Sequence, residues 1–110
     1  SDYPDAARAV GNAVVENKAE RGILVCGSGV GASIAATKIT GVYCAITHDT
    51  YSAAQGVQHD NMNVMAIGGR VIGQSTAISL VDAFLGATFL TEPARYLRRF
   101  KDIQALENGE

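Results

Sequence analysis

The sequence predicts an α/β fold: a Rossmann-like three-layer sandwich built on a parallel sheet. Helical and strand-like patterns alternate along the chain. The stretches 22–26 and 63–69 are short apolar runs that are typical of central strands. A glycine-rich loop follows 22–26 directly and opens a helical pattern. Short crossovers between elements in this order favour parallel strands that are covered by helices on both faces.

The first three elements are a helix, a strand and a helix. A helix is expected over 3–19, because Pro4 occupies a first-turn position and apolar residues recur at helical spacing. A strand buried on both faces is expected over 22–26, where the residues do not alternate in polarity. The helix after the glycines is expected over 31–39 and ends near Gly41.

The pattern continues with a strand at 41–48, a helix at 49–58 and a third strand at 63–69. Asp49 or Thr50 is the expected N-cap of this helix, because a side-chain oxygen there can accept a hydrogen bond from the first turn.

Two helices complete the chain. One is expected over 73–87, with Ser75 or Thr76 near its N-cap. The other is expected over 92–107, with Pro93 in its first turn and a basic outer face. No repeat or low-complexity linker divides the sequence, so residues 1–110 are expected to form one domain.

Three strands make a thin sheet, and a chain that begins on a helix leaves one edge strand without a neighbour. We therefore expect that an N-terminal βαβ segment is absent from this chain or is supplied by another. Such a unit needs about 30 residues.

Composition excludes several classes of function. Hydrophobic residues make up 47% of the chain and its net charge is −2, so neither nucleic acid nor an anionic membrane is an expected partner. No apolar stretch is long enough to span a bilayer, and no signal peptide is recognisable. The two cysteines form no disulfide framework, which favours reduced thiols in the cytoplasm. With two histidines and no CxxC pair, no metal site is expected.

Cys26 stands at the mouth of the glycine-rich loop. Ligands of open α/β sheets bind at the carboxyl ends of the strands, where this loop is expected to lie. Its N–H groups and the following helix N-terminus favour a phosphate or a reaction oxyanion, and also a thiolate at Cys26. The alternative is that Cys26 packs as an inert, buried hydrophobe.

A dinucleotide site is a second interpretation of the same loop. Gly27, Gly29 and Ala32 fit the pattern G-x-G-x-x-G/A. Asp49 follows about 20 residues later, where the acidic residue that binds the ribose of a dinucleotide is expected. The signal is weak, because such a domain needs two mononucleotide-binding halves.

His59 precedes the third strand, where an imidazole can move protons near neutral pH. The alternative is a solvated histidine at a helix end. His48 is interpreted as a strand-end residue, and Cys44 as a core residue in the middle of a strand.

Three arginines are candidates for binding an anion. Arg95 and Arg99 are four residues apart on the last helix and share a face, which suits a phosphate clamp or simply a solvated basic surface. Arg70 follows the third strand and is therefore expected at the ligand-binding edge.

The sequence resembles the ribose-5-phosphate isomerase B family, which includes the subunits of galactose-6-phosphate isomerase. Matching stretches run in the family's order and cover nearly the whole chain: DYPDAA, RGILVCGSGVGASIAATKI, GVYCAITHDTYSA, QHDNMNVMAIGGRVIG and ARYLRR.

The resemblance implies an aldose–ketose isomerase that acts on a sugar phosphate without metal or organic cofactor. It makes Cys26 the base that moves a proton between C2 and C1, and His59 the residue that helps to open the sugar ring. It assigns the enediolate to the loop residues Gly27, Ser28, Gly29 and Gly31. It assigns the phosphate to Arg70, Arg95 and Arg99, partly across the interface of a homodimer or a dimer of dimers.

Three departures stand out. The family opens with a strand that ends in an Asp-His pair, and this chain has no such segment, in agreement with the strand count. Asp60 follows the histidine where relatives usually have Asn, so a carboxylate there can alter the choice of substrate. Tyr96 replaces a histidine of some relatives.

The presence of both Cys26 and His59 favours the interconversion of ribose 5-phosphate and ribulose 5-phosphate. Two alternatives are an isomerase of a tetrose, allose or galactose phosphate, and a non-catalytic subunit that binds phosphate.

Overall fold

The fold has the predicted order of elements. The computed structural model describes residues 2–110. Its elements are α1 (Tyr3–Val15), β1 (Gly22–Cys26), α2 (Val30–Thr37), β2 (Cys44–Ile46), α3 (Thr50–Asp60), β3 (Val64–Gly68), α4 (Gln74–Gly86) and α5 (Ala94–Glu107). Within the described residues, no helix is both long and apolar enough to cross a bilayer.

The strands form a parallel sheet in the order β1-β3-β2, which confirms the predicted α/β class. All five residues of β3 are buried, as expected of a central strand. The prediction that β1 is also central is not met in this chain. Among the described strands β1 pairs only with β3, and Val25 on it is 66% exposed. Its place at the edge agrees with the expected missing neighbour.

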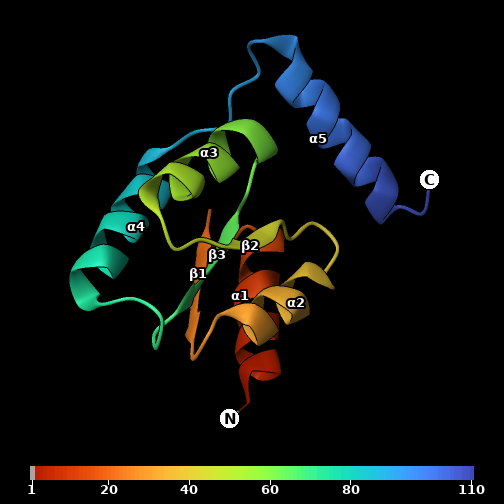
Figure 1. Cartoon of the computed structure of the whole chain (residues 1–110). Helices are drawn as coiled ribbons and strands as arrows, with labels where there is room; N and C mark the ends of the chain where they lie inside the picture. The colour runs from red at the N-terminus through yellow and green to blue at the C-terminus, as the bar shows by residue number, and fades with distance from the viewer. Residues whose placement is uncertain (1) are drawn as a thin grey trace.

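Helices cover both faces of the sheet, and alternate residues of β3 separate the two cores (Figure 1). Val64 and Ala66 face α1 and α2, whereas Met65 and Ile67 face α3 and α4. This arrangement is the predicted three-layer sandwich.

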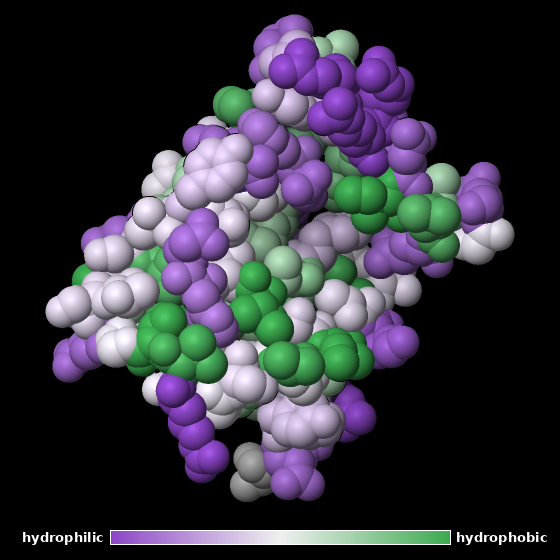
Figure 2. Space-filling view, in the orientation of Figure 1, coloured by the Kyte–Doolittle hydropathy of each residue, from purple (hydrophilic) through white to green (hydrophobic). Residues whose placement is uncertain are grey.

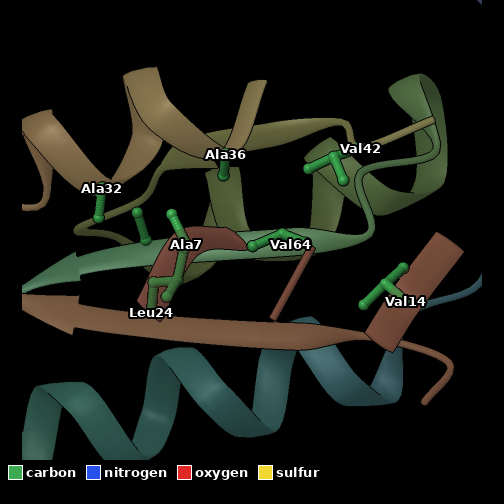
Figure 3. Close-up of a cluster of buried hydrophobic side chains, with 8 residues drawn as sticks. Ala7, Val14, Leu24, Ala32, Ala36, Val42 and Val64 are labelled. Atoms are coloured by element: carbon green, nitrogen blue, oxygen red, sulfur yellow. The ribbon is translucent and has the colours of Figure 1, made fainter. Parts of the chain in front are cut away.

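The core between the sheet and the α1–α2 layer is lined mainly by small side chains. Ala7 on α1 and Ala32 and Ala36 on α2 lie against Leu24 and Val64 (Figure 3). Their small volume lets α2 lie close to the strands, and this closeness fixes the position of the loop that connects β1 to α2.

The opposite core contains larger side chains. Phe84 and Leu80 of α4 pack with Val57 of α3 against the sheet. The guanidinium of Arg21 lies over the Phe84 ring and donates to the carbonyl oxygens of Phe84 and Ala87. It thereby satisfies carbonyl groups that the end of α4 leaves free.

Several predicted boundaries are wrong by a few residues. The N-terminal helix ends at Val15 rather than at 19, and the second strand is only three residues long. Asp49, not Thr50, caps α3: its carboxylate accepts from the N–H of Ser52 at 2.6 Å.

The last two helices begin within two residues of the predicted positions. Gly73 is the N-cap of α4, so Ser75 and Thr76 lie inside its first turn. Pro93 is the N-cap of α5 rather than a residue of its first turn.

Helix α5 stands away from the layers and is joined to them by aromatic and polar contacts (Figure 1). Phe100 meets the ring of Tyr43 edge-on at 4.9 Å and that of Phe89 at 5.4 Å. Glu107 accepts from the Tyr43 hydroxyl and from the N–H of Gly41, both at 2.9 Å. These bonds hold the far end of α5 beside β2.

Candidate active site

The loop between β1 and α2 is packed tightly against the end of β3. Gly29, the N-cap of α2, has a φ of +84°, in the left-handed region that favours glycine. A Cβ atom on Gly29 would lie 3.2 Å from the carbonyl carbon of Ile67, so a larger residue would be crowded as well as strained.

Backbone hydrogen bonds join this loop to the turn that follows β3. The N–H of Gly69 donates to the Cys26 carbonyl at 2.7 Å, and the N–H of Arg70 donates to the Gly27 carbonyl at 3.0 Å. The register of β1 on β3, which places Cys26 beside Gly68, brings these groups within reach.

His48 supports the same turn, a role that the sequence did not indicate. Its Nε2 accepts a hydrogen bond from the N–H of Gly68 at 2.9 Å. An accepting Nε2 requires the other ring nitrogen, Nδ1, to carry the proton of the neutral ring. His48 is therefore more than a strand-end residue, although no sequence motif marks this contact.

The Cys26 thiol lies at the mouth of the loop. Its sulfur accepts from the N–H of Gly29 at 3.2 Å, while the Ser28 hydroxyl oxygen accepts from the N–H of Val30 at 3.2 Å. The donors are the N–H groups of the N-cap and of the first residue of α2, which the helix itself leaves without a partner.

A pocket of about 470 Å³ opens here. It is lined by Tyr3, Cys26, Gly27, Ser28, Gly31, Arg70 and Val71. The structure thus brings together five of the residues that the sequence singled out, and it adds Tyr3, which was not foreseen. A Cβ atom on Gly31 would lie 2.6 Å from the Tyr3 ring, so the glycine makes room for this aromatic wall.

The pocket combines a thiol, a helix N-terminus and a guanidinium. The N-terminus of α2 and Arg70 attract negative charge, and a thiolate can accept a proton. Cys44 is in a different environment: burial raises the pKa of its thiol, and it packs against the core between the sheet and the α1–α2 layer. Cys44 is the first residue of β2 rather than a mid-strand residue.

A second cluster of predicted site residues forms where α3 meets α5. The rings of His59 and Tyr96 are stacked, with centroids 4.1 Å apart and planes 16° apart. The Arg95 guanidinium lies 4.9 Å from the centre of the Tyr96 ring. His59 and Asp60 belong to the last turn of α3, not to a loop, while Arg99 lies one turn beyond Arg95 on α5.

A groove of about 610 Å³ runs between α5 and the end of β2, next to this cluster. Asp60, Met62, Ile103 and Leu106 contribute to its walls. Figure 2 shows a hollow beside α5 and hydrophobic atoms along the side of the helix that faces it.

The two clusters lie at opposite ends of the parallel strands. Cys26 and Arg70 are at the carboxyl ends of the strands, whereas His59 precedes the amino end of β3. The length of β3 separates these two ends by roughly 15 Å. One chain therefore does not bring Cys26 and His59 into a common pocket. Nor does any group of three or more His, Cys, Asp or Glu side chains within residues 2–110 have a metal-binding arrangement.

Fold and site together define a class: a Rossmann-like α/β protein with a glycine-rich loop and a pocket at the carboxyl ends of its strands. Residues 1–103 match the model of the Ribose/Galactose Isomerase family. The chain belongs to this family of aldose–ketose isomerases.

Individual relatives agree with this assignment. Ribose-5-phosphate isomerase B of Escherichia coli is 43% identical over 107 residues, which cover 97% of this chain and 70% of the relative. D-erythrulose-4-phosphate isomerase of Pectobacterium atrosepticum is 44% identical over 87 residues, or 79% of this chain and 57% of the relative.

Among solved structures, ribose-5-phosphate isomerase B of Mycoplasma genitalium with bound ribulose 5-phosphate superimposes with a TM-score of 0.90 at 40% identity. The match covers 100% of this chain and 72% of that one. Across these three comparisons the chain therefore spans between 57% and 72% of the relative's length.

Proposed function

We propose that this chain interconverts ribose 5-phosphate and ribulose 5-phosphate through an enediolate, with Cys26 as the general base. The observation that carries the proposal is the position of the Cys26 sulfur, 3.2 Å from the Gly29 nitrogen, in a pocket that also holds Ser28 and Arg70. A base beside preformed N–H donors is what proton abstraction next to a carbonyl requires.

The reaction needs no redox partner. The Cys26 thiolate takes the proton from C2 of the open-chain aldose, and the C–H electron pair forms the C1–C2 double bond while the carbonyl oxygen becomes negative. The loop Gly27–Gly31, including Ser28, stabilises this enediolate with its N–H groups. Cys26 then returns the proton to C1, and the proton of O2 passes to the negatively charged O1, which leaves a hydroxyl on C1 and restores a carbonyl at C2.

The ring of ribose 5-phosphate must open before this proton transfer. We assign this step to His59, which can pass a proton to the ring oxygen. Arg70, Arg95 and Arg99 bind the phosphate, because guanidinium groups form paired, charge-assisted hydrogen bonds with phosphate oxygens. Asp60, next to His59, contacts the sugar.

The wide separation of Cys26 from His59 supports a site shared between two copies of the chain. In a homodimer, or a dimer of dimers, the carboxyl edge of one sheet meets the α3–α5 cluster of the partner, so that two equivalent sites form. Phosphorylated sugars are held inside cells, so we place this enzyme in the cytoplasm.

Two alternatives remain testable with the same protein. The first is another aldose phosphate as substrate, since one relative is named for D-erythrulose 4-phosphate and Asp60 introduces a carboxylate at the site. The second is a subunit that binds phosphate without turnover.

The test uses protein expressed from its complete reading frame and follows the conversion of ribose 5-phosphate to ribulose 5-phosphate. Cys26→Ser should abolish turnover, and Cys44→Ser, a matched control outside the pocket, should retain it. Equal activity in the wild type and Cys26→Ser would remove Cys26 from the role of base. A wild type that binds phosphate but converts no sugar phosphate would favour the non-catalytic alternative.

A further inference from the structure

Tyr96 makes the closest aromatic contact to His59. The two rings are nearly parallel, 16° apart, with centroids at 4.1 Å. His59 comes from α3 and Tyr96 from α5, so the contact joins two helices that are far apart in the sequence.

This stack limits the orientation of the imidazole. A histidine in the last turn of a helix and only half-buried has freedom about its side-chain bonds, with little else to select one orientation. A flat ring at van der Waals contact removes the rotamers that would tilt the imidazole, since these would collide with it.

Arg95 contacts both the ring and the hydroxyl group of Tyr96. The Arg95 guanidinium lies 4.9 Å from the ring centre, and one of its nitrogens donates to the Tyr96 hydroxyl at 3.4 Å. The cation–π contact is made with the ring, so it does not need the hydroxyl. The ring is therefore the part of Tyr96 that matters for His59.

We infer that Tyr96 is a positioning residue: its ring aims the His59 imidazole at the oxygen of the cyclic sugar. This inference rests on the proposed function, because it concerns the ring-opening step. It predicts that Tyr96 matters only for substrates that enter as closed rings.

Two substrates separate this role from a general structural one. Ribose 5-phosphate has a free O4 and closes to a five-membered ring. Erythrose 4-phosphate carries its phosphate on O4, so it cannot close such a ring and needs no ring opening. Both substrates require the same proton transfer by Cys26.

The experiment compares Tyr96→Leu, which removes the flat ring, with Tyr96→Phe, which keeps it. For ribose 5-phosphate, kcat/KM should fall by about tenfold or more in Tyr96→Leu and stay within about twofold in Tyr96→Phe. For erythrose 4-phosphate, both variants should stay within about twofold of wild type. Tyr51→Leu, the same substitution at a largely exposed position on α3, is the matched control. It should leave kcat/KM unchanged for both substrates.

An NMR spectrum of the imidazole protons adds a readout that does not depend on activity. The His59 Cε1 proton, assigned with His59→Gln, lies near the face of the Tyr96 ring, so its ring-current shift should be lost in Tyr96→Leu and kept in Tyr96→Phe.

Equal losses for both substrates, or no loss for ribose 5-phosphate, would overturn the inference. A wild type that converts neither sugar would overturn the proposed function instead. The His59 proton then decides whether Tyr96 orients the imidazole: a signal that does not move in Tyr96→Leu overturns that as well.

Discussion

Gly68 and Ser28 touch backbone to backbone. A Cβ atom on Gly68 would lie 2.6 Å from the Ser28 carbonyl oxygen, a distance that real side chains do not tolerate. The end of β3 and the loop after β1 can therefore meet only because residue 68 is glycine. This contact places the loop, Cys26 and Arg70 around one pocket.

We predict that Gly68→Ala lowers the free energy of unfolding by about 1–3 kcal/mol, because the added methyl must push rigid backbone aside. The measurement is urea unfolding of the two proteins. Gly86→Ala is the control: nothing lies within 4 Å of a Cβ there, and alanine favours the helix. Similar urea midpoints for Gly68→Ala and wild type would show that the loop lies farther from β3.

The arginines of α5 give a kinetic prediction. Replacing Arg95 and Arg99 together by Gln should raise the KM for ribose 5-phosphate by about tenfold or more, because charge-assisted hydrogen bonds to the phosphate are lost. Steady-state kinetics check this, with Lys101→Gln, an exposed cation on the same helix, as the control. An unchanged KM in the double variant would mean that this face of α5 is only a solvated basic surface.

Alkaline pH should destabilise the fold through two neighbouring residues. Burial raises the pKa of Cys44 above 9.0, and burial together with the bond to Glu107 raises the pKa of Tyr43 above 10.0. Both groups keep their protons longer in the folded chain, so their contribution is complete below the unfolded pKa values and is lost as pH rises through the folded ones.

The free energy of unfolding should therefore fall above about pH 9. Urea unfolding between neutral and strongly alkaline pH measures the slope. The variant Tyr43→Phe/Cys44→Ser removes both titrations and should show a flatter profile. A profile as steep as that of wild type would assign the alkaline loss to other groups.

The sequence predicted much of the fold because strand polarity and helix signals are local. The run at 22–26, the glycines after it and Arg70 after 63–69 were enough to place one pocket at the carboxyl edge, since parallel strands end together. The count of strands also predicted that one edge of the sheet lacks a partner strand, although it did not indicate which strand lies at that edge.

The errors and omissions involve contacts between distant residues. No sequence motif marks the role of His48, because the hydrogen bond that it accepts from Gly68 depends on how β2 pairs with β3. The stacking of Tyr96 on His59 depends on how α5 returns to α3.

Because Cys26 and His59 are widely separated within one chain, the proposal of a site shared between two chains can be tested directly. Cys26→Ser and His59→Gln are each expected to be inactive, since each removes a group that both sites of a homodimer need. When equal amounts of the two variants are unfolded and refolded together, half of the dimers should contain one chain of each variant. One of the two sites in each of these mixed dimers should be intact. We therefore predict a recovery of about a quarter of the wild-type turnover of ribose 5-phosphate. No recovery, from two variants shown to form mixed dimers, would contradict a site built from two chains.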